Sequence, residues 1–164
     1  MVIDASVAVC KYPSGKCRRF LQAVLDICHR VVMTEAIRRE WYDHAPDHSM
    51  KWLLAMGRKG KVVFLKDDAI RPHEHMDKKT RATLPAEKGR RAVAKDMHLL
   101  AAALATDNTV VSRDKEVREL LREAVREAPR FRKIVWVNPH EEDDSMKWLE
   151  EGAKPERSRM LGQA

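Results

Sequence analysis

Apolar and polar residues along the chain form two alternating patterns, short apolar runs and longer stretches with helical spacing. The apolar runs predict strands at residues 1–3, 30–33, 61–65, 109–112 and 133–137. Apolar side chains recur at helical spacing over residues 16–29, 35–44, 49–56, 92–105 and 114–127. Strands that alternate with helices are typical of a parallel sheet. The pattern therefore predicts an α/β fold with a central parallel five-stranded sheet and helices on both faces.

Two stretches depart from this regular alternation. Residues 71–95 carry eight basic side chains against three acidic ones, and Pro72, Pro85 and Gly89 interrupt them. We expect exposed helix and loop there. Residues 140–164 open on four consecutive acids, which favour the start of a helix, and become polar after Gly152. We expect a short C-terminal acidic helix followed by a frayed polar tail.

Length and charge narrow the class of protein. The chain has 164 residues, of which 44% are apolar, enough for a single domain with its own core. Its 32 Lys and Arg residues against 25 Asp and Glu residues give a net charge of +7. That balance favours a polyanionic partner, nucleic acid first and an anionic membrane second. A basic surface that only maintains solubility is the alternative.

The sequence also argues against several classes of protein and site. Its longest wholly apolar run, residues 99–105, is far shorter than the ~20 residues of a membrane span. The first residues lack the basic and apolar regions of a secretory signal, and Cys10, Cys17 and Cys28 have no CxxC spacing. We therefore expect a cytoplasmic protein with reduced thiols. No GxGxxG, P-loop or HExxH motif is present, which argues against the commonest nucleotide and zinc sites.

Four acids stand at or near the predicted strand ends, where open α/β sheets carry their ligand sites. Asp4 ends the first strand, and Asp114 comes two residues after the fourth. Glu40 lies on the helix after the second strand, and Asp96 opens the apolar helix that precedes the fourth. Clustered carboxylates repel one another, and Mg²⁺ or Mn²⁺ compensates their charge through oxygen ligands. In a basic protein such a cluster favours metal-assisted hydrolysis of a phosphodiester.

Each acid also has an ordinary structural explanation. Asp4 would cap the next helix through its side chain, while Asp96 and Asp114 would be acids in the first turn of a helix. The partners available to Glu40 in an ion pair are Arg38, Arg39 and Lys51. For any single residue these explanations are the better ones. They do not explain why four acids all stand at or near the ends of predicted strands.

Three blocks of sequence resemble the PIN-domain family of metal-dependent nucleases, which includes the VapC-type toxins. Residues 2–9 are similar to the opening strand and turn of the family, and residues 95–104 resemble its long central helix. Residues 110–114 resemble the strand and turn that end in S/T-x-D. By this resemblance Asp4, Asp96 and Asp114 are the first, third and fourth acids of a metal site. Glu40 matches the second acid best, with Glu35 as its rival.

The resemblance covers residues 1–139 and implies a three-layer α/β/α sandwich. It also implies an endoribonuclease that hydrolyses RNA with Mg²⁺ or Mn²⁺, in which Ser6 and Ser112 support the catalytic acids. A homodimer is expected, and for a toxin an antitoxin protein is the further partner. The alternatives are an RNA-processing nuclease outside a toxin–antitoxin pair and a PIN-like RNA-binding module without catalysis.

Basic side chains near Asp96 are the candidates for holding the RNA backbone. They are Arg90, Arg91, Lys95, Lys78, Lys79 and Arg81. A solvated helix face explains the same residues equally well. The pairs His73 with His75 and His44 with His48 lack a third ligand, so zinc is a weak prediction.

Some aromatic and histidine side chains have structural expectations. His98 is expected as a polar residue near Asp96, at the rim of the site. Trp148 is expected to cover a neighbouring surface or a partner chain. The expected core tryptophans are Trp41, Trp52 and Trp136.

Overall fold

Short strands and longer helices alternate in the computed structural model, which describes residues 1–9, 15–73, 82, 84 and 86–163. The strands are β1 (Val2–Ile3), β2 (Val31–Met33), β3 (Val62–Phe64), β4 (Thr109–Val111) and β5 (Val135–Val137). The helices are α1 (Ala5–Ala8), α2 (Lys16–Asp26), α3 (Glu35–His44), α4 (Asp47–Arg58), α5 (Asp67–Ile70), α7 (Ala86–Lys95), α8 (Met97–Leu104), α9 (Lys115–Ala124) and α10 (Ser145–Glu150). The short 3-10 helices within these described residues are η1 (Arg71–His73), η2 (Pro129–Phe131) and η3 (Arg157–Arg159). Every strand falls within a predicted apolar run.

In the described part of the chain the strands form one five-stranded parallel sheet in the order β3-β2-β1-β4-β5. The register pairs Val2 with both Val32 and Val110, so β1 lies at the centre. All residues of the four strands other than β3 are buried. Such strands read as continuous apolar runs because both faces of a parallel sheet are covered. The predicted α/β fold and parallel sheet are confirmed.

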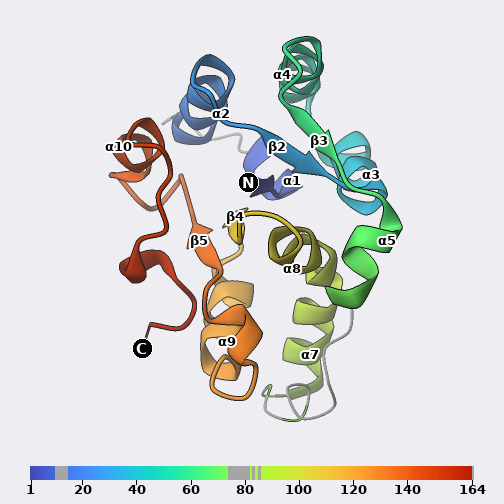
Figure 1. The fold of residues 1–164 in the computed structure, drawn as a ribbon, viewed down its shortest axis with the longest axis vertical. Coiled ribbons are helices and arrows are strands. Elements are labelled where there is room, and N and C mark those ends of the chain that lie inside the picture. Colours follow the sequence, from blue (N-terminus) through green and yellow to red (C-terminus); the bar gives the residue numbers. More distant parts are fainter. Residues whose placement is uncertain (10–14, 74–81, 83, 85, 164) are drawn as a thin grey trace.

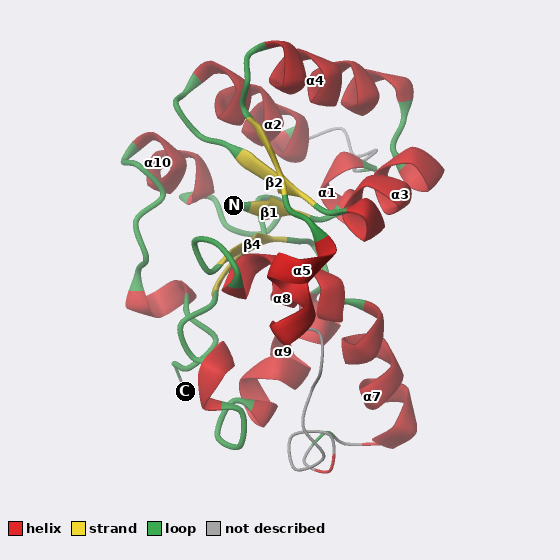
Figure 2. Ribbon diagram, turned by 45° about the vertical axis from the view of Figure 1, so that its right-hand side comes forward, coloured by secondary structure: helices red, strands yellow, loops and turns green. Residues whose placement is uncertain are grey.

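Helices cover both faces of this sheet and complete a three-layer α/β/α sandwich. Figures 1 and 2 show α2, α4 and α10 on one side and α5, α7, α8 and α9 on the other. The contacts agree, because α2 packs against α4 and α10, whereas α8 packs against β1, β4 and α7. The chain changes face because it moves from β1 out to β3, then returns to β4 and continues to β5. Right-handed crossovers in opposite directions place their helices on opposite faces.

The single helix predicted over residues 92–105 is wrong, because the structure has two helices that meet at Asp96. The backbone of Asp96 leaves helical geometry, with φ −94° and ψ 6°. The two helices have different supports: α7 packs along α9, where Gly89 lies against Leu120, and α8 packs on the sheet. A straight helix cannot follow both surfaces. The apolar periodicity does not reveal this break, since both helices present an apolar face inward.

The frayed tail predicted after Gly152 is also wrong. Met160 forms an antiparallel bridge with Val135 of β5, and Leu161 is buried. The Arg159 guanidinium is buried, forms ion pairs with Glu142, Asp144 and Glu156, and lies over the Trp148 ring. The polar composition of the tail suggests solvation, but these side chains neutralise one another against the domain. The four acids of residues 141–144 precede α10, and at least two of them hold this arginine.

The tryptophans anchor the layers to one another. Trp41 and Trp52 stack with ring centroids 5.5 Å apart, and Trp136 is fully buried in β5, as predicted. Trp148 is also buried, and its ring nitrogen donates to the Lys154 carbonyl within the same chain. The Trp41 indole donates to the Ile3 carbonyl at 2.9 Å, which fixes α3 beside the end of β1. None of the helices in the described ranges combines the length and apolarity needed to cross a bilayer.

Candidate functional site

The strand order reverses between β1 and β4, and two of the four acids lie at this point. From β1 the chain continues toward β2, and from β4 toward β5, so the following helices diverge. Asp4 directly follows β1, and its backbone N–H donates to the Val111 carbonyl at the end of β4. Asp114 begins α9 just beyond the same strand. Open α/β sheets bind ligands in the crevice formed at such a reversal.

Asp4 is held by two serine hydroxyls and is only 9% exposed. Ser6 Oγ donates to Asp4 Oδ2 at 2.5 Å, and Ser112 Oγ donates to the same oxygen at 2.6 Å. Asp4 Oδ1 accepts from the Ser6 backbone N–H at 3.2 Å, which caps α1. The expected capping role is therefore present. The two hydroxyls also fix the direction of the carboxylate.

Asp114 caps its helix as well, and one of the same serines connects it to Asp4. Asp114 Oδ1 accepts from the Val117 backbone N–H at 2.8 Å. Its own backbone N–H donates to Ser112 Oγ at 3.1 Å, while that hydroxyl donates to Asp4. Ser112 thus couples the two strand-end acids through one oxygen atom. The side chain of Asp114 is half-buried and faces the same cleft as Asp4.

Asp96 has no comparable structural explanation. It precedes α8, but its carboxylate makes no capping hydrogen bond to that helix. The side chain is nevertheless buried, with 9% exposure. Burial, followed by repulsion from Asp4 and Asp114, raises the pKa of Asp96 from 3.8 to about 7. The carboxylate form of Asp96 is therefore disfavoured both by burial and by the two neighbouring acids.

Glu40 reaches the cleft from α3 and is held by His98 of α8. His98 Nε2 lies 3.1 Å from Glu40 Oε2, and His98 Nδ1 lies 2.9 Å from the Lys95 carbonyl. The hydrogen bond from His98 lowers the pKa of Glu40 against the effect of burial. Burial opposes the charge on His98, but the hydrogen bond and charge of Glu40 outweigh it, so the pKa of His98 is raised. Of the cations expected to neutralise Glu40, Arg38 binds the exposed Glu35 instead.

The four acids line one cleft of about 190 Å³ although they come from four separate segments. The described residues around it are Asp4, Ala5, Ser6, Val9, Glu40, His44, Lys95, Asp96 and Asp114. His44 was predicted only as half of a weak zinc pair, and its place beside Glu40 follows from the last turn of α3. His98 was expected at the rim, but its bond to Glu40 depends on the packing of α3 against α8. The pattern of residues along the sequence does not reveal that contact.

The chemistry of these donors suits a hard divalent cation, although the side chains do not form a finished coordination shell. Carboxylate oxygens are the ligands that Mg²⁺ and Mn²⁺ favour, and a cation would relieve the repulsion that raises the pKa of Asp96. Across the residues that the structure describes, however, no three His, Cys, Asp or Glu side chains are grouped closely enough to hold a metal ion. The four acids nevertheless line the same cleft, with Asp4 and Asp114 close enough to Asp96 to raise its pKa.

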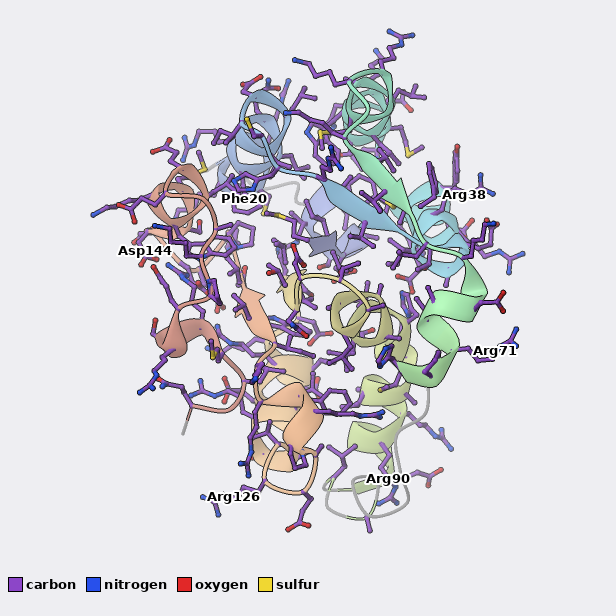
Figure 3. The ribbon with its side chains drawn as sticks, in the orientation of Figure 1. Phe20, Arg38, Arg71, Arg90, Arg126 and Asp144 are labelled. Carbon is purple, nitrogen blue, oxygen red and sulfur yellow. The ribbon has the colours of Figure 1, made fainter. Side chains whose placement is uncertain are left out.

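The basic residues predicted to hold RNA divide into two groups. Arg90, Arg91 and Lys95 share α7, although the predicted helix began only at residue 92, and Lys95 lines the acidic cleft. Arg91 pairs with Glu87 at 2.5 Å, while Arg90 is exposed at the outer part of the helix (Figure 3). The remaining candidates, Lys78, Lys79 and Arg81, lie outside the described residues, as does His75 of the weak zinc pair.

Comparisons with family models, with curated proteins and with solved structures find no match for this chain. The fold and the cleft are therefore described from this chain alone. The resemblance to PIN-domain nucleases rests on the three sequence blocks, and the function that it implies is a proposal.

Proposed function

We propose that this protein is a metal-dependent endoribonuclease whose site is the acidic cleft at the strand-order reversal. The observation that carries the proposal is the convergence of Asp4, Glu40, Asp96 and Asp114 from four segments into one small cleft. The raised pKa of Asp96 supports it, because a buried, repelled carboxylate is costly unless a cation compensates it. The resemblance of residues 1–139 to PIN-domain nucleases points to the same four acids.

The residues of the cleft divide into those that would hold a cation and those that orient them. Mg²⁺ or Mn²⁺ would be held by the four acids, and when bound it supplies water activation and neutralises charge on the phosphate. Ser6 and Ser112 direct the Asp4 carboxylate, and His98 holds Glu40 across the cleft. These bonds orient the carboxylates before any ligand arrives, which lowers the cost of assembling the site.

The substrate in this proposal is RNA, held by its phosphates along α7. Lys95 stands at the cleft and Arg90 farther along the same helix, so a strand that follows α7 would deliver a phosphodiester to the acids. The net charge of +7 favours such a partner. We place the protein in the cytoplasm, since the exposed Cys28 is a free thiol, as in reducing compartments.

Two biological roles fit this activity: the toxin of a toxin–antitoxin pair, and an RNA-processing nuclease. A short neighbouring reading frame that encodes an antitoxin-like protein would favour the toxin. We retain the homodimer as part of the proposal. A PIN-like RNA-binding module without catalysis is the second candidate, because the described acids do not stand in a ready-made metal group.

The test is incubation of the purified protein with an end-labelled RNA pool in Mg²⁺, Mn²⁺ or EDTA. We expect cleavage with either metal and none with EDTA. Asp4→Asn and Asp96→Asn should each reduce the rate by at least about 100-fold, because metal assistance contributes several kcal/mol to such reactions.

The matched control is Glu35→Gln, which removes an exposed acid of α3 that pairs with Arg38 outside the cleft. It should cleave at the rate of the unmodified protein. Cleavage that survives both chelation and Asp96→Asn would overturn the metal-site assignment. Metal-independent RNA binding without any cleavage would favour the second candidate.

A further inference from the structure

A second hollow, away from the acidic cleft, gathers the most exposed large apolar side chains of the described residues. It has a volume of about 430 Å³ and lies between α3, α4 and β3; we call it the β3 groove. Tyr42 is 62% exposed, Leu54 59% and Phe64 66%, and all three line it. Apolar side chains that meet in one place on a surface mark an interaction site more often than scattered ones do.

The groove follows the edge of the sheet that the described chain leaves open. Within the described residues β3 pairs with β2 on one side only, so its outer backbone groups face away from the sheet. At the opposite edge Met160 of the tail bridges to β5. Proteins usually protect a sheet edge, because unpaired strand groups attract other chains. Here one edge is covered from within the chain, while the other lies beside exposed apolar residues.

The α4 wall of the groove presents residues at helical spacing, against which a partner helix can pack. On α4, Met50, Leu53, Leu54 and Gly57 follow one another at helical spacing and line the same side. A Cβ atom added to Gly57 would meet nothing within 4 Å, so the groove is open above this residue. An amphipathic helix places its apolar face in such a hollow between helices.

The charges around the groove favour an acidic occupant. The charged residues among its described lining are Arg38 and Arg58, and none of that lining is acidic. Arg38 binds Glu35 and lies 6.0 Å from the centre of the Tyr42 ring, at the outer surface of α3 (Figure 3). Arg58 is exposed and forms no ion pair with any described residue, so its charge remains available to a partner.

A second copy of this chain fits the groove less well. Two grooves related by a two-fold axis would place one basic lining against another, with no acidic lining residue to oppose the arginines. The acidic run of the chain is not available either, because Glu142 and Asp144 bind Arg159, and Asp143 binds Lys16 at 2.5 Å. Neither the lining of the groove nor this acidic run therefore supplies acids that are free to complement Arg58.

We propose that the β3 groove is the docking site for an amphipathic helix of another protein, with leucine-like side chains on one face and acidic side chains beside them. The apolar face lies over Leu54, Tyr42 and Phe64, and the acids pair with Arg58. This inference goes beyond the nuclease proposal and does not depend on it, because the groove shares no lining residue with the acidic cleft.

The test uses two fluorescent synthetic helical peptides that share one leucine face and carry either Glu or Lys at the other positions. Fluorescence anisotropy should show binding of the Glu peptide and, owing to charge, at least about tenfold weaker binding of the Lys peptide. Leu54→Ser should weaken binding of the Glu peptide by about tenfold, because an apolar anchor is lost.

Gly57 offers a matched pair of variants, since the helix has room for any side chain there. Gly57→Glu and Gly57→Lys add similar bulk to the groove with opposite charge. The Glu peptide should bind Gly57→Glu at least about tenfold more weakly than Gly57→Lys. Thermal melts of each variant that coincide with the unmodified protein show that folding is unaffected.

Equal binding of the two peptides, or unchanged binding by Leu54→Ser, would overturn the proposal. Sedimentation that reveals a dimer dissociated by Leu54→Ser, without peptide binding, would assign the groove to a second copy instead. Co-sedimentation with phosphatidylglycerol vesicles that Leu54→Ser abolishes, again without peptide binding, would assign it to a membrane surface. Either result contradicts the helical partner.

Discussion

The surroundings of Asp96 destabilise its negative charge, whereas those of Asp4 and Asp114 stabilise theirs. Asp4 and Asp114 each accept a backbone N–H at the start of a helix, so the fold gains from their negative charge. Asp96 is as buried as Asp4 but receives no capping bond, and its neighbours repel it. A charged side chain that destabilises the folded state in this way is typical of a functional site.

The raised pKa of Asp96 makes stability depend on pH. Since its pKa is about 7 in the folded protein and near 3.8 when unfolded, the folded state binds the extra proton between these values. The free energy of unfolding therefore falls as pH rises from about 4 to 7. Without divalent cations, Asp96→Asn should raise the free energy of unfolding at pH 8 by about 1–3 kcal/mol, and by less at pH 5.

Urea denaturation of both proteins in EDTA, at pH 5 and pH 8, measures this difference. Asp43→Asn, at an exposed position of α3, is the control and should show no pH-dependent gain. An equal gain for Asp96→Asn at both pH values would mean that the carboxyl group is not destabilised by its surroundings.

The positions of the site residues were predictable from sequence where the backbone alone determines them. Asp4 and Asp114 follow apolar strands, and the carboxyl ends of parallel strands meet at one edge. The bond between Glu40 and His98 joins two helices, and the role of Ser112 requires the register of β1 against β4. These contacts depend on tertiary packing, and the spacing of apolar residues along the sequence gives no information about it.

At the scale of elements, α7 and the tail show where sequence patterns fail. The described strands lie within the predicted runs, and helices α2, α3, α4 and α9 lie at predicted positions with ends that differ by up to three residues, because burial and period coincide there. The short helix α5 was not predicted. The break at Asp96 arises because α7 packs on α9 and α8 on the sheet. The tail packs through the bridge from Met160 to β5 and through Arg159, which binds three carboxylates and lies over an aromatic ring.

The tail should depend on Arg159 more than on its neighbours. Arg159→Leu leaves the half-buried Glu142 with reduced compensation and removes the contact with Trp148. We expect a loss of about 1–3 kcal/mol in the free energy of unfolding, less than for a fully buried pair because Asp144 and Glu156 are exposed to solvent.

Arg157→Leu is the matched control, since it lies on the same short helix but is exposed. It should change the free energy of unfolding by no more than about 0.5 kcal/mol in urea denaturation. Equal losses in the two variants would show that the tail is held by apolar burial alone.

Helix α7 is the element expected to contact RNA. Lys95→Gln should lower the affinity for a short single-stranded RNA and reduce the slope of log affinity against log salt by about 0.7, the change for one lost phosphate contact. Lys59→Gln, at an exposed position after α4, should leave the slope unchanged. Salt titrations by filter binding in EDTA measure both. An unaltered slope for Lys95→Gln would place the RNA elsewhere.

At the scale of the molecule, an acidic cleft lies in a protein of net charge +7, and the whole fold should respond to a cation that binds there. Mn²⁺ at about 100 times its dissociation constant should stabilise the protein by about 2–3 kcal/mol, seen as a higher Tm. The increase should be larger at pH 8 than at pH 6, because protons compete for Asp96 below its pKa of about 7.

Differential scanning fluorimetry with Mn²⁺ at both pH values measures this response. Asp96→Asn should lose most of the increase, and Glu35→Gln should retain it. If Mn²⁺ raises the Tm of Asp96→Asn as much as that of the unmodified protein, the ion binds outside the cleft.

The bond from Ser112 to Asp4 spans 108 positions of the chain, and this separation has a consequence during synthesis. A growing chain contains Asp4 almost from the start, but β4 and Asp114 are synthesised only after about two-thirds of the chain has been made. Until β4 pairs with β1, Asp4 lacks one of its two hydroxyl donors and its acidic neighbour Asp114, which lies just beyond that strand. The acid cluster therefore assembles late, and a shorter nascent or truncated chain carries no complete cleft beside the RNAs of the translation machinery.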